Sequence, residues 1–111
     1  MGVLAVGDVV AVEFPYSNYL KYKKRPALII GLADFDNYII CQITSKDLAS
    51  QSAITLRNTD FIEGGLRINS YIRPDKIYTV EAFIIDRSVG KVSTKIMAEV
   101  RRRLAQLLGL V

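Results

Sequence analysis

The chain of 111 residues contains no histidine and a single cysteine. Without histidine, neither a Ser-His-Asp nor a Cys-His nucleophilic triad can form, and paired histidines cannot serve as acid and base on a phosphodiester. The same composition argues against a transition-metal site. The sequence therefore predicts no metal and no cofactor, and any catalysis must rely on arginine, lysine, hydroxyl groups and carboxylates.

The single cysteine, Cys41, cannot form an internal disulfide and lies in an apolar run. We expect it to be a small core side chain rather than a nucleophile, in a reducing compartment. The amino terminus is too short an apolar run for a signal peptide and lacks a basic region. No stretch approaches the ~18 apolar residues that cross a bilayer. These features predict one soluble, cytoplasmic domain over residues 1–111, away from membranes.

Short strands separated by turn signals fill most of the chain. A turn signal spans 34–37, a loop spans Glu63–Gly65, and Asp75–Val80 is compatible with a single helical turn. The alternation and punctuation predict strands at Val9–Phe14, Arg25–Leu32, Tyr38–Ser45, Ala53–Leu56, Ile68–Arg73 (ended by Pro74) and Ala82–Val92 (bent at Val89–Gly90).

The carboxyl end changes to a helical period. Apolar residues recur there at three- and four-residue steps, which defines one face of a helix. Ser93 or Thr94 can cap its start, and Gly109 is a suitable stop. The members of the apolar face are Ile96, Met97, Val100, Leu104, Leu107 and Leu108. Five or six short strands closed by one amphipathic helix predict a mainly β protein, built as a small, strongly bent antiparallel sheet or barrel.

A basic, tyrosine-rich segment precedes the second predicted strand. Tyrosines alternate there with cations, and the net charge of the chain is +4. Aromatic rings beside cations suit single-stranded nucleic acid, which needs surfaces for its bases and charge for its phosphates. From spacing alone, the pattern favours a solvated loop whose tyrosines pack locally over a contact with nucleic acid. The residues concerned are Tyr16, Tyr19, Lys21, Tyr22, Lys23 and Lys24.

Arg25 differs from the neighbouring cations because Pro26 and an apolar strand follow it at once. Its planar guanidinium matches phosphate oxygens and would stabilise an anionic transition state without proton transfer. Thr44 and Ser45 end the third predicted strand, where their hydroxyls could donate to a phosphoryl oxygen. Arg73 is a third anion-binding candidate beside a proline. β-propensity alone would also place a threonine at position 44, and spacing does not establish that these residues converge.

The order of these motifs resembles the MazF/PemK-like toxins, the ribonuclease components of toxin–antitoxin pairs. The resemblance runs from Gly7 to Leu110. It is carried by "GDVVAVEFPYS", "KRPALII", "CQITS", "SYIRPDKIYTV" and "SVGKVS", followed by the terminal helix.

This resemblance implies an SH3-like barrel with a carboxyl-terminal helix, usually in a homodimer, that cleaves single-stranded RNA without a metal. The products would carry 2′,3′-cyclic phosphate and 5′-hydroxyl ends. By position, Arg25 and Thr44 match the family's catalytic pair. Arg73 matches a residue near the RNA groove more loosely, and Ser45 is a neighbour. A cognate antitoxin with an acidic segment would block the basic groove.

The first loop departs from the family pattern, in which a small acidic stretch is common. Here "YSNYLKYKK" takes its place, so the RNA sequence preference does not carry over. Two alternatives stay open. A CcdB-like toxin that poisons DNA gyrase uses the same barrel without catalysis and would not need Arg25 and Thr44. An RNA-binding module without cleavage would show salt-dependent binding but no product.

Overall fold

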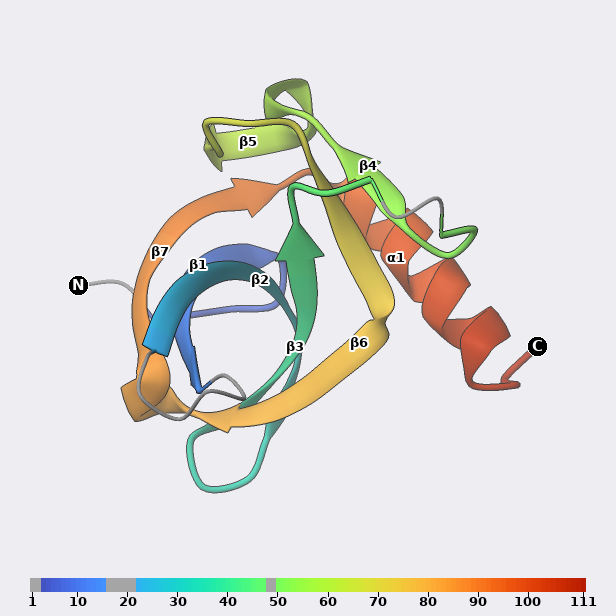
Figure 1. Ribbon diagram of the computed structural model, residues 1–111. Helices are drawn as coiled ribbons and strands as arrows, with labels where there is room; N and C mark the ends of the chain where they lie inside the picture. Colours follow the sequence, from blue (N-terminus) through green and yellow to red (C-terminus); the bar gives the residue numbers. More distant parts are fainter. Residues whose placement is uncertain (1–2, 16–21, 48–49) are drawn as a thin grey trace.

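A curved antiparallel sheet of seven strands forms most of the protein, and Figure 1 shows it curling into a half-barrel with one helix outside. The computed structural model describes residues 3–15, 22–47 and 50–111. In spatial order the strands are β4-β6-β3-β2-β1-β7-β5. Their bounds are β1 Asp8–Pro15, β2 Tyr22–Ala33, β3 Asn37–Thr44, β4 Ile54–Leu56, β5 Phe61–Gly64, β6 Ser70–Glu81 and β7 Ile85–Val92, with 3-10 turns at Asn58–Asp60 (η1) and Ala82–Ile84 (η2).

Bulges give the sheet its curvature. Ile30 has no partner between the pairs that join β2 to β3, and Asp86 and Val89 are extra residues of β7 where it pairs with β1. A larger irregularity separates the pairs Cys41↔Ile77 and Gln42↔Arg73, so that residues 74–76 of β6 have no partner on β3. Each extra residue bends its strand and increases the twist. The strands therefore wrap around instead of forming a flat layer.

The predicted barrel with a carboxyl-terminal helix is confirmed, and the first three strands lie within a few residues of their predicted positions. Four local predictions were wrong. The last strand does not begin at Ala82, because Ala82–Ile84 forms the 3-10 turn η2 and β7 begins at Ile85. Glu63–Gly65 is not only a loop, because β5 runs to Gly64. Asp75–Val80 is not a helical turn, and Pro74 does not end its strand, because β6 continues to Glu81. Pro74 is tolerated because it lies in the unpaired bulge, where the ladder needs no donor.

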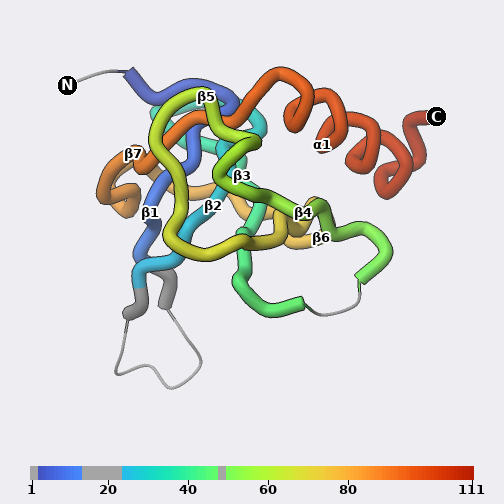
Figure 2. Tube along the Cα trace, turned by 90° about the horizontal axis from the view of Figure 1, so that it is seen from above, coloured from blue at the N-terminus to red at the C-terminus, as the bar shows by residue number. Residues whose placement is uncertain are grey.

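Helix α1 spans Thr94–Leu107 and lies beside β4 and β6 (Figures 1 and 2). Its start is capped by Ser93, whose hydroxyl accepts a hydrogen bond from the Ile96 amide at 3.2 Å. Gly109 follows its end with φ of +71°, a conformation that glycine adopts readily. The predicted cap and stop are both confirmed. No helix in the described part of the chain is long and apolar enough to cross a membrane.

Two apolar clusters occupy opposite faces of the sheet, as the alternation of the strands requires. On one face, Leu28, Cys41 and Ile43 pack with Ile96, Met97 and Val100 of α1. On the other, the core contains Val10, Val12, Ala27, Ile29, Ile40 and Val80. Cys41 is fully buried, as predicted, and burial raises the pKa of its thiol to about 12.

Candidate functional site

Strands β2 and β3 separate at one end of the sheet. Their ladder ends at the pair Ala27↔Gln42. Beyond this pair, β2 stays paired with β1 as far as Tyr22, and β3 stays paired with β6 as far as Thr44. The two strands therefore form a fork whose prongs are residues 22–26 of β2 and 43–44 of β3. Pro26 lies at its base, where its missing N–H removes no bond from the β2–β3 ladder.

Arg25 and Thr44 lie on opposite prongs of this fork. Each lies two residues beyond the last pair of the ladder, Ala27↔Gln42, and by strand alternation on the same face of the sheet as Ala27. Thr44 is 6% exposed, and its hydroxyl accepts a hydrogen bond from the Lys46 amide at 3.2 Å. Because the oxygen accepts this bond, its own proton can still be donated to a third group. Arg25 and Thr44, which match the family's catalytic pair by position, therefore belong to the same end and the same face of the sheet.

A cavity of about 510 Å³ opens at the fork. We call it the fork cavity. Its walls combine cationic, hydroxyl and apolar side chains, so it suits a ligand that is anionic and partly apolar. The lining residues are Lys24, Arg25, Pro26, Ile43, Ser45, Leu66, Arg67, Ile68 and Ser70. Ser45, predicted as an RNA contact, belongs to this cavity, whereas Thr44 does not line it.

Within the predicted basic, tyrosine-rich segment, the structure describes the side chain of Lys24. Its ammonium pairs with Asp86 at 3.1 Å, and its side chain is 53% exposed. Such an exposed pair is weak and screened by salt, so Lys24 remains available to a polyanion at the fork. The side chains of the other predicted contacts in this segment are not described. Tyr19 and Lys21 lie outside the described residues, as does Tyr16, and for Tyr22 and Lys23 only the β2 backbone is described.

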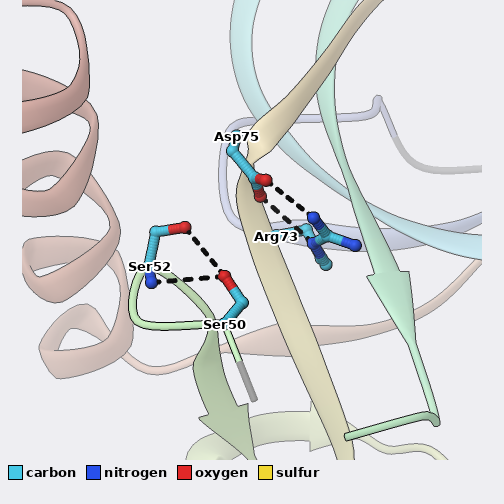
Figure 3. A network of polar contacts seen from close by, with 4 residues as sticks. All are labelled: Ser50, Ser52, Arg73 and Asp75. Atoms are coloured by element: carbon cyan, nitrogen blue, oxygen red, sulfur yellow. Dashed lines mark hydrogen bonds and ion pairs between the residues drawn. The ribbon is translucent and has the colours of Figure 1, made fainter. Parts of the chain in front are cut away.

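Arg73 is held by Asp75 in a two-pronged ion pair (Figure 3), with the Nη2 to Oδ2 distance at 2.7 Å. This pair raises the pKa of Arg73 and lowers the pKa of Asp75, chiefly through the hydrogen bonds between them. Arg73 pairs with Gln42, and its side chain lies on the same face of the sheet as that of Thr44. The predicted cation is therefore near the fork but is already engaged by a carboxylate.

Two further groups of residues at the fork were missed in the sequence. Arg67 and Ser70 line the cavity, and the pair Thr44↔Tyr71 places the Tyr71 side chain on the face that Arg25 and Thr44 share. The alternation within "SYIR" could have placed Tyr71 and Arg73 on one face. Their proximity to the first strands depends on the β3–β6 pairing, which no local pattern reveals.

A second and larger cavity, about 810 Å³, lies near β1 and β7. Its wall has three carboxylates (Asp8, Glu63 and Asp86) but two cations, and one of these, Lys91, pairs with Asp8 at 3.2 Å. A wall with this balance does not favour a polyanion. The fork cavity is therefore the better candidate for an anionic ligand.

Comparison with known proteins gives a family and a fold. A family profile described as "PemK-like, MazF-like toxin of type II toxin-antitoxin system" matches residues 5–108. A comparison with curated proteins gives no significant match.

Solved structures resemble the chain over almost its whole length. MazF in a MazE–MazF crystal structure from Deinococcus radiodurans superposes with a TM-score of 0.81 at 19% identity, covering 100% of both chains. An endoribonuclease from a mycobacterial species, in complex with its cognate antitoxin, gives 0.73 at 18% identity and covers 98% of this chain and 96% of that one. The toxin MazF-mt6 of Mycobacterium tuberculosis gives 0.73 at 14% identity, covering 92% and 96%. At such identities, the similarity establishes the fold.

Proposed function

Because this chain belongs to the PemK-like, MazF-like toxins of type II toxin–antitoxin systems, we propose that it is an endoribonuclease that cleaves single-stranded RNA without a metal ion. Structural relatives described as endoribonucleases support this activity. The observation that carries the proposal is the fork, where Arg25 and Thr44 follow the end of the β2–β3 ladder on one face of the sheet. The net charge of +4 agrees with an anionic substrate.

In the proposed reaction, the 2′-hydroxyl of the RNA attacks the adjacent phosphorus. A bond forms between the 2′ oxygen and phosphorus while the bond from phosphorus to the 5′ oxygen breaks. The 2′-hydroxyl loses one proton and the departing 5′ oxygen gains one, so the products are a 2′,3′-cyclic phosphate and a 5′-hydroxyl. The RNA supplies its own nucleophile, which suits a chain without histidine.

Arg25 and Thr44 would act on the phosphoryl oxygens. The guanidinium of Arg25 stays protonated and can neutralise the charge that develops as phosphorus becomes five-coordinate. Thr44 can donate its hydroxyl proton to a non-bridging oxygen, because the Lys46 amide fixes the hydroxyl oxygen from the other side. Losing one such donor typically lowers kcat by about 10²–10³.

The same basic fork suits a proteinaceous inhibitor. The relatives from Deinococcus radiodurans and a mycobacterial species were crystallised with MazE or a cognate antitoxin. We infer that a cognate antitoxin with an acidic segment covers the cations at the fork and excludes RNA, and that the toxin acts as a homodimer in the cytoplasm.

A cleavage assay on a long mixed-sequence RNA in excess EDTA tests the activity. We expect wild type to produce fragments with cyclic phosphate ends, and Arg25→Ala to lower the rate by at least about 10². Arg101→Ala removes the same charge from an exposed position on α1 and should cleave like wild type. Equal cleavage by wild type and Arg25→Ala would refute the assigned role. Folded wild type that cuts no RNA would refute the nuclease.

A further inference from the structure

We propose that the fork cavity is a nucleobase pocket that selects the base beside the scissile bond, with Arg67 as its principal recognition residue. This inference rests on the proposed function, because it places a piece of the same RNA in the cavity. It assigns a role to a side chain that is not part of the reacting pair.

The residues at the fork fall into two sets, one on each face of the sheet. By strand alternation, Arg25 and Thr44 share one face, whereas Lys24, Pro26, Ile43 and Ser45 belong to the other, on the side of the helix-facing cluster. This second set lines the fork cavity together with Leu66, Arg67, Ile68 and Ser70, and Arg25 also borders it. A strand of RNA whose phosphate meets Arg25 can therefore place an adjoining base in the cavity.

The size and walls of the cavity suit a base. Its volume of about 510 Å³ lies within the range of small-molecule pockets, about 300–1,000 Å³. Pro26 and Ile43 provide apolar surface in the cavity, and Leu66 lines it and packs against the core. Ile68 lies at the wall and is 64% exposed. A base lying against Ile68 would cover this surface.

Arg67 adds a planar cation to the wall. Among the described residues, none forms a hydrogen bond or an ion pair with Arg67, in contrast to Lys24 and Arg73, which have carboxylate partners. A guanidinium plane can stack on an unpaired base and can also bind a phosphate or a base edge. Arg67 therefore places at the fork cavity a guanidinium that makes no hydrogen bond or ion pair with the residues that the structure describes.

The wall that carries Arg67 is anchored on both sides. The Leu66 amide donates to the side-chain oxygen of Asn58 at 3.0 Å, and the Gly65 amide donates to the Val89 carbonyl at 3.2 Å. After this wall, Ser70 is 4% exposed and donates its hydroxyl to the Ile68 carbonyl at 2.9 Å. These bonds fix the backbone before the ligand arrives, which lowers the entropic cost of binding.

Ser45 and Ser70 can provide polar contacts to the edge of a base. Because the Ser70 hydroxyl already donates its proton to Ile68, its oxygen can only accept from a ligand. Ser45 follows directly on Thr44 and lines the same cavity. The turn that the Thr44–Lys46 hydrogen bond closes holds Ser45 in place. The pocket thus combines apolar walls, a stacking cation and a few fixed polar groups.

Two measurements test the pocket independently of each other. The first maps the cleavage sites of wild type, Arg67→Ala, Arg67→Lys and the control Arg101→Ala on one RNA library. We expect Arg67→Ala to lose the preference at one position beside the cut and to raise KM about tenfold, with kcat nearly unchanged. Arg67→Lys keeps the charge but not the plane, so it should lose the preference while retaining most of the salt dependence of binding.

The second measurement separates this proposal from the proposed function. Four 2′-deoxy hexanucleotides, each made of one base, cannot be cleaved by 2′-hydroxyl attack, and their binding is followed by fluorescence anisotropy. Wild type should favour one base, and Arg67→Ala should weaken that oligonucleotide about tenfold and leave the others less affected. Arg101→Ala should match wild type.

The possible outcomes are distinct. Cleavage by wild type with an unchanged site pattern and unchanged KM in folded Arg67→Ala overturns the pocket and leaves the nuclease intact. In that case a protein segment, such as part of an antitoxin, becomes the expected occupant of the cavity. Base-selective binding that depends on Arg67, without any cleavage by wild type, supports the pocket and overturns the nuclease.

Discussion

Arg73 and Asp75 form an ion pair at the bulge of β6. Arg73 Nε donates a hydrogen bond to Asp75 Oδ1 at 3.1 Å, and Nη2 donates one to Oδ2 at 2.7 Å. The pair spans Pro74, at the start of the segment of β6 that has no partner on β3. The two hydrogen bonds therefore stabilise a local geometry that the sheet ladder does not fix.

This pair predicts a pH-dependent contribution to stability. The hydrogen bonds from Arg73 lower the pKa of Asp75 below its unfolded value of about 3.9. Its stabilisation is therefore fully present above that value and is lost as the pH falls through the still lower folded pKa. Asp75→Asn should lower the free energy of unfolding by about 1 kcal/mol or less at pH 6, because the pair is partly exposed.

Urea unfolding of wild type and Asp75→Asn between pH 6 and pH 2 measures this effect. The difference in the free energy of unfolding between the two proteins should stay constant from pH 6 to pH 5 and then disappear as the solution becomes more acidic. Asp34→Asn, at an exposed position in the β2–β3 turn, serves as the control. A gap that stays constant down to pH 2 would show that the charge of Asp75 does not stabilise the fold.

Cys41 should be almost inert in the folded protein. It is fully buried, and desolvation by burial, followed by the nearby charge of Asp75, raises the pKa of its thiol to about 12. At pH 8 only about 10⁻⁴ of the thiol would then be ionised, and the thiolate is the reactive form. Labelling with a thiol reagent at pH 8 should be slow in buffer and immediate in 6 M guanidinium chloride. Rapid labelling without denaturant would mean that the sheet opens readily around β3.

The turn between β2 and β3 contains backbone strain that a substitution can relieve. Phe35 and Asp36 have φ of 60° and 58°, in the left-handed region, which costs a non-glycine residue about 1–2 kcal/mol. The Phe35 side chain is 94% exposed, so it gains little from packing. Phe35→Asn should therefore raise the free energy of unfolding by about 0.5–1 kcal/mol, since asparagine tolerates this conformation better.

Phe83→Asn provides the matched control. Phe83 is also largely exposed, at 81%, but its φ is not positive. Thermal and urea unfolding of both variants should show a gain for Phe35→Asn and little change for Phe83→Asn. An equal gain in both would trace the effect to the removal of an exposed aromatic side chain.

The parts of the fold with strong local signals could be predicted from the sequence. The period of the apolar residues, the cap at Ser93 and the stop at Gly109 predicted α1 almost to the residue. Pro74 had the opposite effect, because a proline inside a strand usually ends it. The three unpaired residues of β6 remove that conflict, and they are a property of the β3–β6 register. Strand β5 was missed because pairing with β7, rather than its own sequence, defines it.

In the candidate site, too, some residues have a local sequence signal and others are brought there only by strand pairing. Arg25 and Ser45 could be singled out because arginine before a buried strand and hydroxyls at a strand end are chemically conspicuous. Arg67 could not, because it follows two glycines in a segment without periodicity and comes to the fork only through the folding of the sheet. Sequence predicted which chemistry was available, whereas the register determined which residues meet.

The sharpest test of the reacting pair compares two substitutions at Thr44. Thr44→Ser keeps the hydroxyl that accepts from the Lys46 amide, whereas Thr44→Val keeps the shape and removes it. We expect Thr44→Ser to cleave RNA within a few-fold of wild type, and Thr44→Val to lose about 10²–10³ in kcat, as for one donor to a developing oxyanion. Thr44→Val should also lose about 1 kcal/mol of stability, because the Lys46 amide loses its acceptor.

Stability and kcat must therefore be measured together. The comparison requires kcat at a temperature where every variant is fully folded, confirmed by circular dichroism. Lys46→Pro removes the amide that donates to Thr44 and leaves the threonine hydroxyl in place, and Lys46→Ala, which keeps the amide, controls for the lost charge. If Lys46→Pro lowers kcat much less than Thr44→Val does, the hydroxyl itself contacts the phosphate. If the two variants lose kcat equally, Thr44 acts by holding the turn before Ser45, and the catalytic role would rest on Arg25 alone.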